Sequence, residues 1–294
     1  MEGRGSAVRA ARRCPVARVG CLVPALLLAV STSRLHAETH LARQTIQRTG
    51  VLVIAHRGCS CQFPENTLAA FQGAVACGAD LVELDYHQSS DKVPVVLHDE
   101  LLDRTTDAPR VLGREGLTVG EVTLADLKRL DAGSWFDPRF ASQRLPTLAE
   151  ALDAIQPRSM TLIERKAGDP KPLIDLLRQK GCLEQVVVQS FDWAFVAQCR
   201  QLAPTLVLGA LGNKPPNEGQ LEAAAATGAD AIVWNYKQLG RAQIRQIHSL
   251  GKKAWAYTVN DPADAQRLVR AGIDGLITDD PATIRQAIAP LLAP

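Results

Sequence analysis

Acidic residues occur inside two short runs of the sequence that are otherwise strongly apolar. Glu83 and Asp85 lie two residues apart in "DLVELDYH", and Glu164 lies in "MTLIERK". Side chains alternate along a strand, so Glu83 and Asp85 point to the same side of theirs. Carboxylates buried without partners would cost several kcal/mol each or become protonated. If the three meet, a divalent cation would relieve their repulsion, and oxygen ligands favour Ca²⁺ or Mg²⁺ over zinc.

Basic residues offer a second explanation for these carboxylates. Lys166 shares a strand face with Glu164, Arg165 lies between them, and Arg57 ends an earlier apolar run. Each acidic group could pair with one of these cations, because structural ion pairs also gather such residues. The residues alone therefore leave two alternatives, a metal centre and a set of salt bridges.

Two histidines end apolar runs of the same kind. His56 ends "VLVIAH" directly before Arg57, and His98 ends "PVVLH". A lone histidine at a strand end is ordinarily satisfied by backbone carbonyls. Two of them at one edge of a sheet favour a chemical role, because the pKa of histidine lies near neutrality.

Nine β-branched runs alternate with helical patterns and would position these residues. They are residues 51–56, 80–87, 94–99, 160–166, 185–190, 205–211, 230–234, 252–259 and 274–278. Most are continuously apolar, which is typical of strands covered on both faces. The alternation predicts a distorted (β/α)₈ TIM barrel. An open doubly wound sheet would need a glycine-rich loop after the first strand, and "HRGCSCQFPEN" is not one.

One of the nine runs is surplus to an eight-stranded barrel. Runs 80–87 and 94–99 are separated by about six residues, too few for a parallel crossover. We therefore expect an extra antiparallel hairpin strand after the second barrel strand. Folding about Ser90–Asp91 would place His98 level with Glu83. This returns His98 to the carboxyl ends of the barrel strands, where the active sites of such barrels lie.

The first residues have the features of a secretory signal peptide. Five arginines precede the apolar run 21–30, and a small residue, Ala37, follows it. The alternative, a transmembrane anchor, needs about 20 apolar residues. We predict a signal peptide at residues 1–37, a short lead-in at 38–50 and one barrel domain at 51–294. The mature protein would be exported, periplasmic or secreted, with no stable membrane anchor.

Net charge limits the classes of binding partner, and the number of cysteines limits the possible disulfides. The formal net charge is +2, and six arginines and one glutamate lie in residues 1–37, which leaves −3 for the rest. Nothing therefore predicts a nucleic-acid partner.

Five cysteines follow the signal peptide, and their odd number leaves at least one thiol free. Cys59 and Cys61 flank Ser60 without a partner at zinc-like spacing, and Cys182 with Cys199 is a candidate disulfide.

Together the motifs resemble the glycerophosphodiester phosphodiesterase family. The resemblance covers about residues 51–285 and includes His-Arg-Gly, Pro-Glu-Asn-Thr, Glu-X-Asp and His-Asp in that order. It implies a distorted β/α barrel that hydrolyses a small-molecule glycerophosphodiester to sn-glycerol 3-phosphate and an alcohol. It also implies one divalent cation, Ca²⁺ or Mg²⁺. The preferred head group and the oligomeric state are left open.

The resemblance also implies a role for each candidate residue. The metal ligands would be Glu83, Asp85 and Glu164. The catalytic residues would be His56 and His98. The residues that bind phosphate or substrate would be Arg57, Lys166 and Trp255.

These roles make physical sense for a phosphodiester. A cation and a guanidinium can offset charge on the nonbridging oxygens. One histidine can take a proton from the attacking oxygen while the other protonates the leaving alkoxide. We assign His56 as base and His98 as acid, an order that the residues do not fix. The attacking oxygen is either water or a hydroxyl of the substrate's own glycerol.

Two other functions fit the same residues. A lysophospholipase D-type phosphodiesterase would need an exposed apolar lip, which Trp135 and Phe136 could supply. A glycerophosphodiester-binding protein without catalysis would need no acid–base pair, so His56 with His98 argues against it. The segment 100–150 should form only a small lip, and Glu65 either shapes the mouth or stabilises the first turn of a helix.

Overall fold

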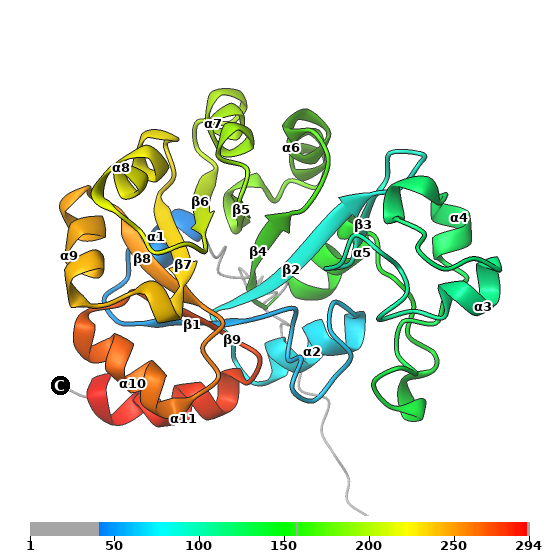
Figure 1. Cartoon of the computed structure of the whole chain (residues 1–294), viewed down its shortest axis with the longest axis horizontal. Coiled ribbons are helices and arrows are strands. Elements are labelled where there is room, and N and C mark those ends of the chain that lie inside the picture. The colour runs from blue at the N-terminus through cyan, green and yellow to red at the C-terminus, as the bar shows by residue number, and fades with distance from the viewer. Residues whose placement is uncertain (1–40, 157, 293–294) are drawn as a thin grey trace, which may run out of the picture. The chain divides into compact units, whose positions relative to one another are not determined.

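Eight parallel strands close into a barrel, and a ninth strand pairs outside it (Figure 1). The structure is a computed structural model that describes residues 41–156 and 158–292. The barrel strands are β1 (Leu52–Ala55), β2 (Leu81–Gln88), β4 (Met160–Arg165), β5 (Val186–Ser190), β6 (Val207–Gly212), β7 (Ala231–Asn235), β8 (Lys253–Tyr257) and β9 (Gly275–Thr278). Pairing of β1 with both β9 and β2 closes the ring. The predicted distorted (β/α)₈ barrel is confirmed, whereas the predicted signal peptide lies outside the described residues.

Alternate residues of the strands fill the interior of the barrel. Ile54, Leu162, Val187, Val233 and Ile277 belong to one buried cluster there. The short helix α1 (Ala42–Ile46) adds two of its own apolar residues to that cluster. Because side chains alternate, the residues between these face outward and pack beneath the helices.

Helices cover the outside of the barrel, as Figure 1 shows for α6 to α11. They are α2 (Leu68–Ala76), α5 (Leu148–Ile155), α6 (Pro170–Gln179), α7 (Trp193–Leu202), α8 (Glu218–Ala226), α9 (Arg241–Ser249), α10 (Pro262–Ala271) and α11 (Pro281–Leu292). Thr67, Thr147, Asp192, Asn217 and Asp261 each accept a first-turn N–H, which stabilises a helix by about 1 kcal/mol. In residues 41–156 and 158–292, no helix is both long and apolar enough to cross a bilayer.

The ninth strand, β3 (Pro94–Val96), runs antiparallel to β2 as predicted, but one residue out of the predicted register. Val96 pairs with Tyr86, so His98 falls opposite Leu84 and not opposite Glu83. The turn causes the shift. Ser89 N–H bonds the carbonyl of Val93 at 3.0 Å, which leaves three residues in the turn, and its last residue, Lys92, has a φ of +65°.

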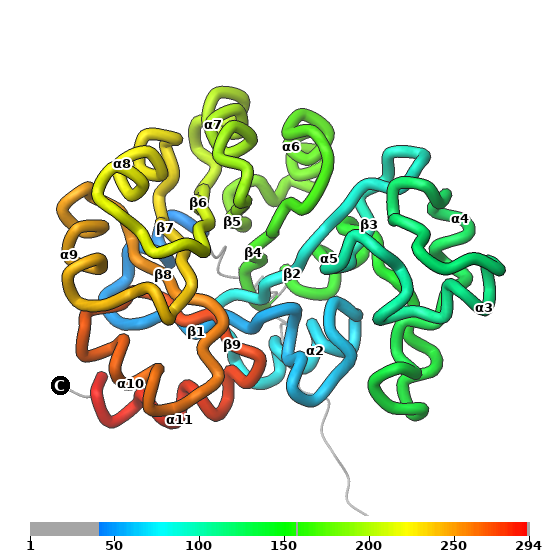
Figure 2. Tube along the Cα trace, viewed as in Figure 1, coloured from blue at the N-terminus to red at the C-terminus, as the bar shows by residue number. Residues whose placement is uncertain are grey.

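The segment between β3 and α5 is larger than the small lip that the sequence predicts. It contains α3 (Ala108–Leu112), η1 (Val119–Glu121), α4 (Leu124–Leu127) and η2 (Pro138–Phe140). Elsewhere in the chain, short 3₁₀ helices occur at η3 (Leu183–Gln185) and η4 (Tyr236–Gln238). Figure 2 shows this segment beside β3. It has its own apolar cluster, which includes Leu102, Val119, Leu127, Leu130 and Leu145. Many apolar residues of this segment are therefore buried against one another, whereas Leu101 and Trp135 are exposed.

The predicted disulfide between Cys182 and Cys199 is wrong. Both cysteines are free and buried. The thiol of Cys182 turns back to the carbonyl of Leu177, at 3.7 Å, while Cys199 lies on α7 in the main apolar cluster. Each sulfur is thus packed within the layer between strands and helices. Burial raises the pKa of the Cys199 thiol to about 12.

Candidate active site

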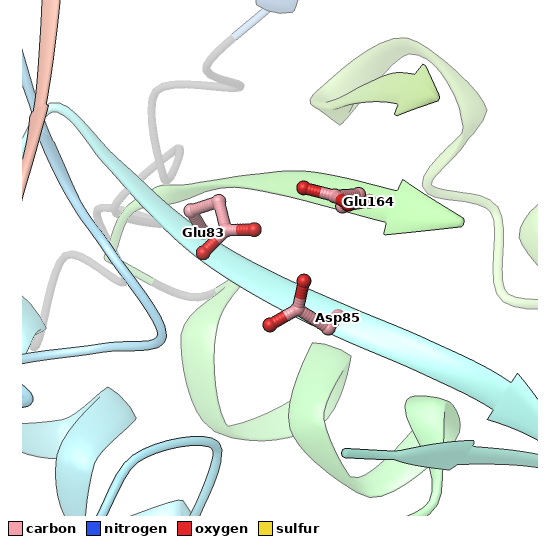
Figure 3. Close-up of side chains that lie close together, drawn as sticks. All are labelled: Glu83, Asp85 and Glu164. Atoms are coloured by element: carbon pink, nitrogen blue, oxygen red, sulfur yellow. The ribbon is translucent and has the colours of Figure 1, made fainter. Parts of the chain in front are cut away.

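Three carboxylates meet inside the barrel near the carboxyl ends of β2 and β4. Figure 3 shows Glu83, Asp85 and Glu164 pointing toward one another. One oxygen of each lies within 4.8 Å of the other two. Asp85 pairs directly with Glu164 across the two strands. All three are buried, so the convergence predicted from strand alternation is present in the fold.

Burial and mutual repulsion set the ionisation of this cluster. Burial, then Asp85 and Glu164, raise the pKa of Glu83 well above its usual value. Burial and Asp85 raise the pKa of Glu164 to about 7, although Lys166 opposes the shift. Burial also disfavours charge on Asp85, but Lys166 and Arg57 outweigh it and lower its pKa to about 2. A cation among these groups would favour their ionised forms.

Lysine and arginine neutralise the carboxylates only in part. Lys166 Nζ contacts Glu164 Oε1 and lies 3.0 Å from Asp85 Oδ1, outside hydrogen-bond geometry. Arg57 Nε lies 3.6 Å from Asp85 Oδ2. Glu83 accepts the Arg57 backbone N–H at Oε2, at 2.8 Å, but its Oε1 has no hydrogen-bond partner.

The salt-bridge alternative is thus realised for Asp85 and Glu164 but not for Glu83. Arg165 takes no part, because it faces the helices, where its NH1 lies 3.0 Å from Asp192 of α7. Two cations therefore face three acids. An unpartnered buried carboxylate oxygen within a set of oxygen donors fits a hard divalent cation.

His56 follows β1 and is held by a carboxylate from the other end of the chain. Its Nδ1 lies 2.6 Å from Asp279 Oδ1, just beyond β9. Ser60 Oγ donates to the same carboxylate at 3.0 Å, and Asn260 Nδ2 donates to Oδ2 at 2.5 Å. The bond at Nδ1 fixes the tautomer and leaves Nε2 of the ring available for proton transfer.

His98 is held in a similar way by its own neighbour in the chain. Its Nδ1 lies 2.6 Å from Asp99 Oδ1, and Arg104 in turn binds Asp99 through two nitrogens. His87 Nε2 donates to the His98 carbonyl at 3.1 Å. Burial lowers the pKa of His98, and the charges of Lys166 and Arg57 act in the same direction against that of Asp85.

Glu65 connects the surroundings of the two histidines. It accepts from Arg57 NH1 at 2.9 Å and from Arg104 NH2 at 2.7 Å. It lines a cavity of about 480 Å³ together with His56, Arg57, Ser60, Cys61, Asn260, Asp279 and Asp280. Of the two roles that the sequence leaves open for Glu65, shaping the mouth is the one that this geometry supports.

The loop that carries Arg57 has an unusual backbone. Arg57 and Asn66 have φ values of +54° and +57°, a conformation that non-glycine residues rarely adopt. Asn66 Nδ2 donates to Asp85 Oδ2 at 2.9 Å, and its Oδ1 accepts the Asp85 backbone N–H at 3.2 Å. Strained residues of this kind often lie at functional sites. Here the hydrogen bonds of Arg57 N–H to Glu83 and of Asn66 to Asp85 hold the two residues in this conformation.

Several residues of the site were missed by sequence reasoning. Asn66 lies within the Pro-Glu-Asn-Thr motif, and Asp279 follows an apolar strand in "LITDDP", so strand-end position is a signal for both. Asp99 is part of the His-Asp motif. Asn260 and Arg104 follow no comparable pattern, because each acts only through a carboxylate of the site.

Trp255 is not in the cavity beside His56. It is fully buried in the interior cluster, and its Nε1 has no hydrogen-bond partner. Tyr257, two residues further along β8, packs edge-on against Phe191, which is 44% exposed. The predicted contact of Trp255 with substrate therefore stays a prediction, while Phe191 and Tyr257 form an accessible apolar surface.

Fold and site together define a barrel enzyme with two oriented histidines beside a candidate metal centre. The chain belongs to the glycerophosphoryl diester phosphodiesterase family, whose model matches residues 56–283. The glycerophosphodiester phosphodiesterase of Caldanaerobacter subterraneus is 36% identical over 243 residues, which cover 79% of this chain and 96% of the relative. The Bacillus subtilis enzyme of that name is 35% identical over 253 residues, covering 79% and 84%.

Solved structures agree with this assignment. An Oleispira antarctica phosphodiesterase, solved in complex with the product sn-glycerol-3-phosphate, is 30% identical and has a TM-score of 0.74. The match covers 81% of this chain and 96% of that one. An Agrobacterium tumefaciens glycerophosphodiester phosphodiesterase is 29% identical, with a TM-score of 0.70. The activity of this chain is accordingly that of a glycerophosphodiester phosphodiesterase.

Proposed function

We propose that this enzyme releases sn-glycerol 3-phosphate from glycerophosphodiesters with the help of one divalent cation, Ca²⁺ or Mg²⁺. Glu83, Asp85 and Glu164 would hold the ion. The observation that carries the proposal is the unpartnered Oε1 of Glu83 among three buried carboxylates that lie within 4.8 Å of one another. The bound ion would supply positive charge to a nonbridging phosphate oxygen.

His56 and His98 are the proposed acid–base pair. Asp279 and Asp99 bind their Nδ1 atoms, each at 2.6 Å, so the Nε2 atoms exchange protons with the substrate. One histidine takes the proton of the attacking oxygen, and the other protonates the leaving alkoxide. The order with His56 as base and His98 as acid remains the prediction made from the sequence.

Arg57 and Lys166 are the proposed phosphate ligands. Arg57 Nε is buried without a hydrogen-bond partner, although its NH1 is held by Glu65. A donor of this kind is suited to an anionic oxygen, and a guanidinium can contact two oxygens at once. Lys166, beside Asp85 and Glu164, would place a second positive charge near the same phosphate.

A metal titration tests this proposal. Protein stripped with a chelator should release no glycerol 3-phosphate from glycerophosphocholine, and Ca²⁺ or Mg²⁺ should restore release. Glu83→Gln should bind the ion more weakly and lose turnover, whereas Glu222→Gln on the exposed face of α8 is the matched control. Full turnover by stripped protein, or by Glu83→Gln, would contradict the metal role.

A lysophospholipase D-type activity is the second candidate, and one observation favours it. Trp135 is 40% exposed and packs edge-on against Phe136, with ring centroids 5.7 Å apart, while Phe191 is 44% exposed. Exposed aromatics of this kind could contact an acyl chain. A higher kcat/KM for lysophosphatidylcholine than for glycerophosphocholine would favour this candidate, and the reverse would exclude it as the main activity.

Export is part of the proposed function, and its support is the sequence of residues 1–37. Expression of the full chain should yield a mature protein that begins at Glu38, in the periplasm or the medium. N-terminal sequencing of the fractionated protein checks this. Recovery of the chain with residues 1–37 intact in the cytosol would contradict it.

A further inference from the structure

Cys61 lines the cavity beside His56, with Cys59 beside it and Cys77 near Cys59, although no step of the proposed chemistry uses a thiol. The sulfurs of Cys59 and Cys61 are 3.9 Å apart. Cys59 is buried, whereas Cys61 is exposed and lines the cavity. Cys77, at the end of α2, is close enough to Cys59 to affect the pKa of its thiol, while its own Sγ donates to the Ala74 carbonyl at 3.2 Å. All three are free.

The loop after β1 is what brings these thiols together. The Cys59 N–H bonds the Ala70 carbonyl at 3.0 Å, and Gly58 lies so close to α2 that a Cβ there would be 2.6 Å from the Ala70 backbone. Cys77 follows Ala70 by seven residues, or about two turns along the same face of the helix. The backbone of Cys59 is therefore held against α2, whereas Cys61 lines the cavity.

We propose that Cys59 and Cys61 form a reversible disulfide, an oxidation site that lowers turnover; the effect on turnover rests on the proposed function. The oxidant would be a low-molecular-weight disulfide, RSSR. Disulfides of this type are expected to form in the oxidising compartments to which export would deliver the protein.

The exchange balances without a further reagent. The exposed sulfur of Cys61 attacks RSSR, which releases one RSH and leaves a mixed disulfide on Cys61. The sulfur of Cys59 then attacks Cys61 Sγ and expels the second RS group as RSH. Two protein thiols have lost two electrons and two protons, and RSSR has become two RSH.

Each attack requires loss of the thiol proton, because the thiolate is the reactive form in such exchange. Cys61 is exposed and can lose its proton to solvent. The proton of Cys59 leaves with the expelled RS group as RSH.

Closure of the disulfide would disturb His56 through Ser60. The hydroxyl of Ser60, between the two cysteines, donates to the His56 carbonyl at 2.8 Å and to Asp279 at 3.0 Å. The Cys61 N–H also bonds the Asp279 carbonyl, at 3.2 Å. Bringing the sulfurs from 3.9 Å to a bond of about 2 Å must shift this loop. We expect turnover to fall about tenfold or more, because small misplacements of catalytic groups are costly.

Peptide mapping of the metal-loaded mature protein tests the site directly. The protein is equilibrated with oxidised or reduced glutathione, its free thiols are alkylated, and it is cut with trypsin and a glutamate-specific protease. Cleavage after Arg57 and Glu65 isolates residues 58–65, with Cys59 and Cys61 but without Cys77. Oxidised protein should yield this peptide unalkylated and lighter by two hydrogen atoms, and dithiothreitol should reverse the change. Full alkylation in every buffer, or a crosslink to the peptide of Cys77, would overturn the proposal.

Activity ratios separate this site from the proposed function. The turnover of oxidised protein relative to reduced protein should fall about tenfold for wild type and for Cys199→Ser, a buried cysteine elsewhere, but not for Cys61→Ser. Equal loss in Cys61→Ser would overturn the link to turnover. If reduced protein releases no glycerol 3-phosphate with any divalent ion, the proposed function fails, while the peptide map still decides whether the disulfide forms.

Discussion

His56 and His98 are held by the same kind of bond in different electrostatic surroundings. Among the residues that the structure describes, the Asp279 carboxylate receives, besides His56, only the neutral donors Ser60 and Asn260. Asp99 receives the cation Arg104 in addition to His98. Each bonded histidine lowers the pKa of its aspartate, that of Asp279 to about 2, but for Asp99 the largest cause is Arg104.

The comparison shows that the aspartate that orients a histidine can be its neighbour in the chain or a residue from a distant segment. Asp99 follows His98 directly, and the Arg104 that neutralises it also binds Glu65, which binds Arg57. Asp279 lies 223 residues from His56 and contacts no guanidinium among the described residues. A change near His98 should therefore spread to Arg57, a proposed phosphate ligand, whereas a change near His56 should remain confined.

The largest effect should come from the histidines themselves. His56→Ala and His98→Ala should each lower kcat by about 10²- to 10⁴-fold, because each removes one proton-transfer group. His248→Ala, on the exposed side of α9, is the control and should leave kcat unchanged. Steady-state release of glycerol 3-phosphate measures all three. Near-wild-type turnover in either active-site variant would remove that residue from the mechanism.

Substitution of Asp279 and of Asp99 should affect kcat and KM differently, because the two aspartates lie in different electrostatic surroundings. Asp279→Asn should lower kcat by about 10²-fold with little change in KM, because the amide favours the wrong histidine tautomer. Asp99→Asn should lower kcat similarly and also raise KM. Arg104 would lose the negative charge of Asp99, and this would disturb Glu65, which Arg104 binds beside Arg57. Rates measured at saturating and at low substrate concentration give kcat and KM separately for each variant. An equal change in KM for both variants would contradict the comparison.

The carboxylate cluster of Glu83, Asp85 and Glu164 should make stability depend on pH when the ion is absent. Burial raises the pKa of Glu164 from 4.5 to about 7, so between these values the folded state binds more protons than the unfolded state. The free energy of unfolding should therefore fall as pH rises through this window, by about 3 kcal/mol.

Denaturant titrations from pH 5 to 8 in chelator measure this dependence. Divalent ion should reduce the slope, because it favours the ionised carboxylates in the folded state. Glu164→Gln should reduce it as well, while Glu222→Gln should retain it. A free energy of unfolding that rises with pH across this window in the ion-free wild type would contradict the assignment.

The smallest effects should come from the donors that hold the aspartates. Arg104→Gln removes charged hydrogen bonds, each worth about 1.5–3 kcal/mol, so kcat/KM should fall about 10- to 100-fold. Ser60→Ala removes a neutral one worth about 0.5–1.5 kcal/mol, and kcat/KM should fall about two- to tenfold. Thermal melts check that both variants fold. A larger fall in kcat/KM for Ser60→Ala than for Arg104→Gln would contradict the prediction that the charged donor at Asp99 matters more than the neutral donor at Asp279.

Much of the barrel could be predicted because its signals are local. Each of the nine apolar runs coincides with a strand to within a few residues at either end, and alternation along β2 and β4 was enough to place Glu83, Asp85 and Glu164 on one side. The length of the link between β2 and β3 predicted the antiparallel hairpin. Its register was missed by one residue, because Lys92 adopts a positive φ for which its side chain offers no signal.

The rest of the site depends on contacts between distant segments. Asn66 reaches Asp85 only because the loop after β1 lies over β2. The candidate disulfide failed for a related reason, since an odd count of cysteines says nothing about which sulfurs are packed apart. Trp255 is completely buried in the interior of the barrel, a position that its sequence context did not predict, and its contact with substrate stays a prediction.

The sequence by itself determined the strands, the hairpin and the carboxylates on a common face, because apolar periodicity and link length act over a few residues. Only the tertiary structure decided which carboxylate holds His56. Barrel closure pairs β1 with β9 and places Asp279 2.6 Å from a histidine 223 residues away. No local pattern encodes that distance, because it is set by the twist and closure of the whole sheet.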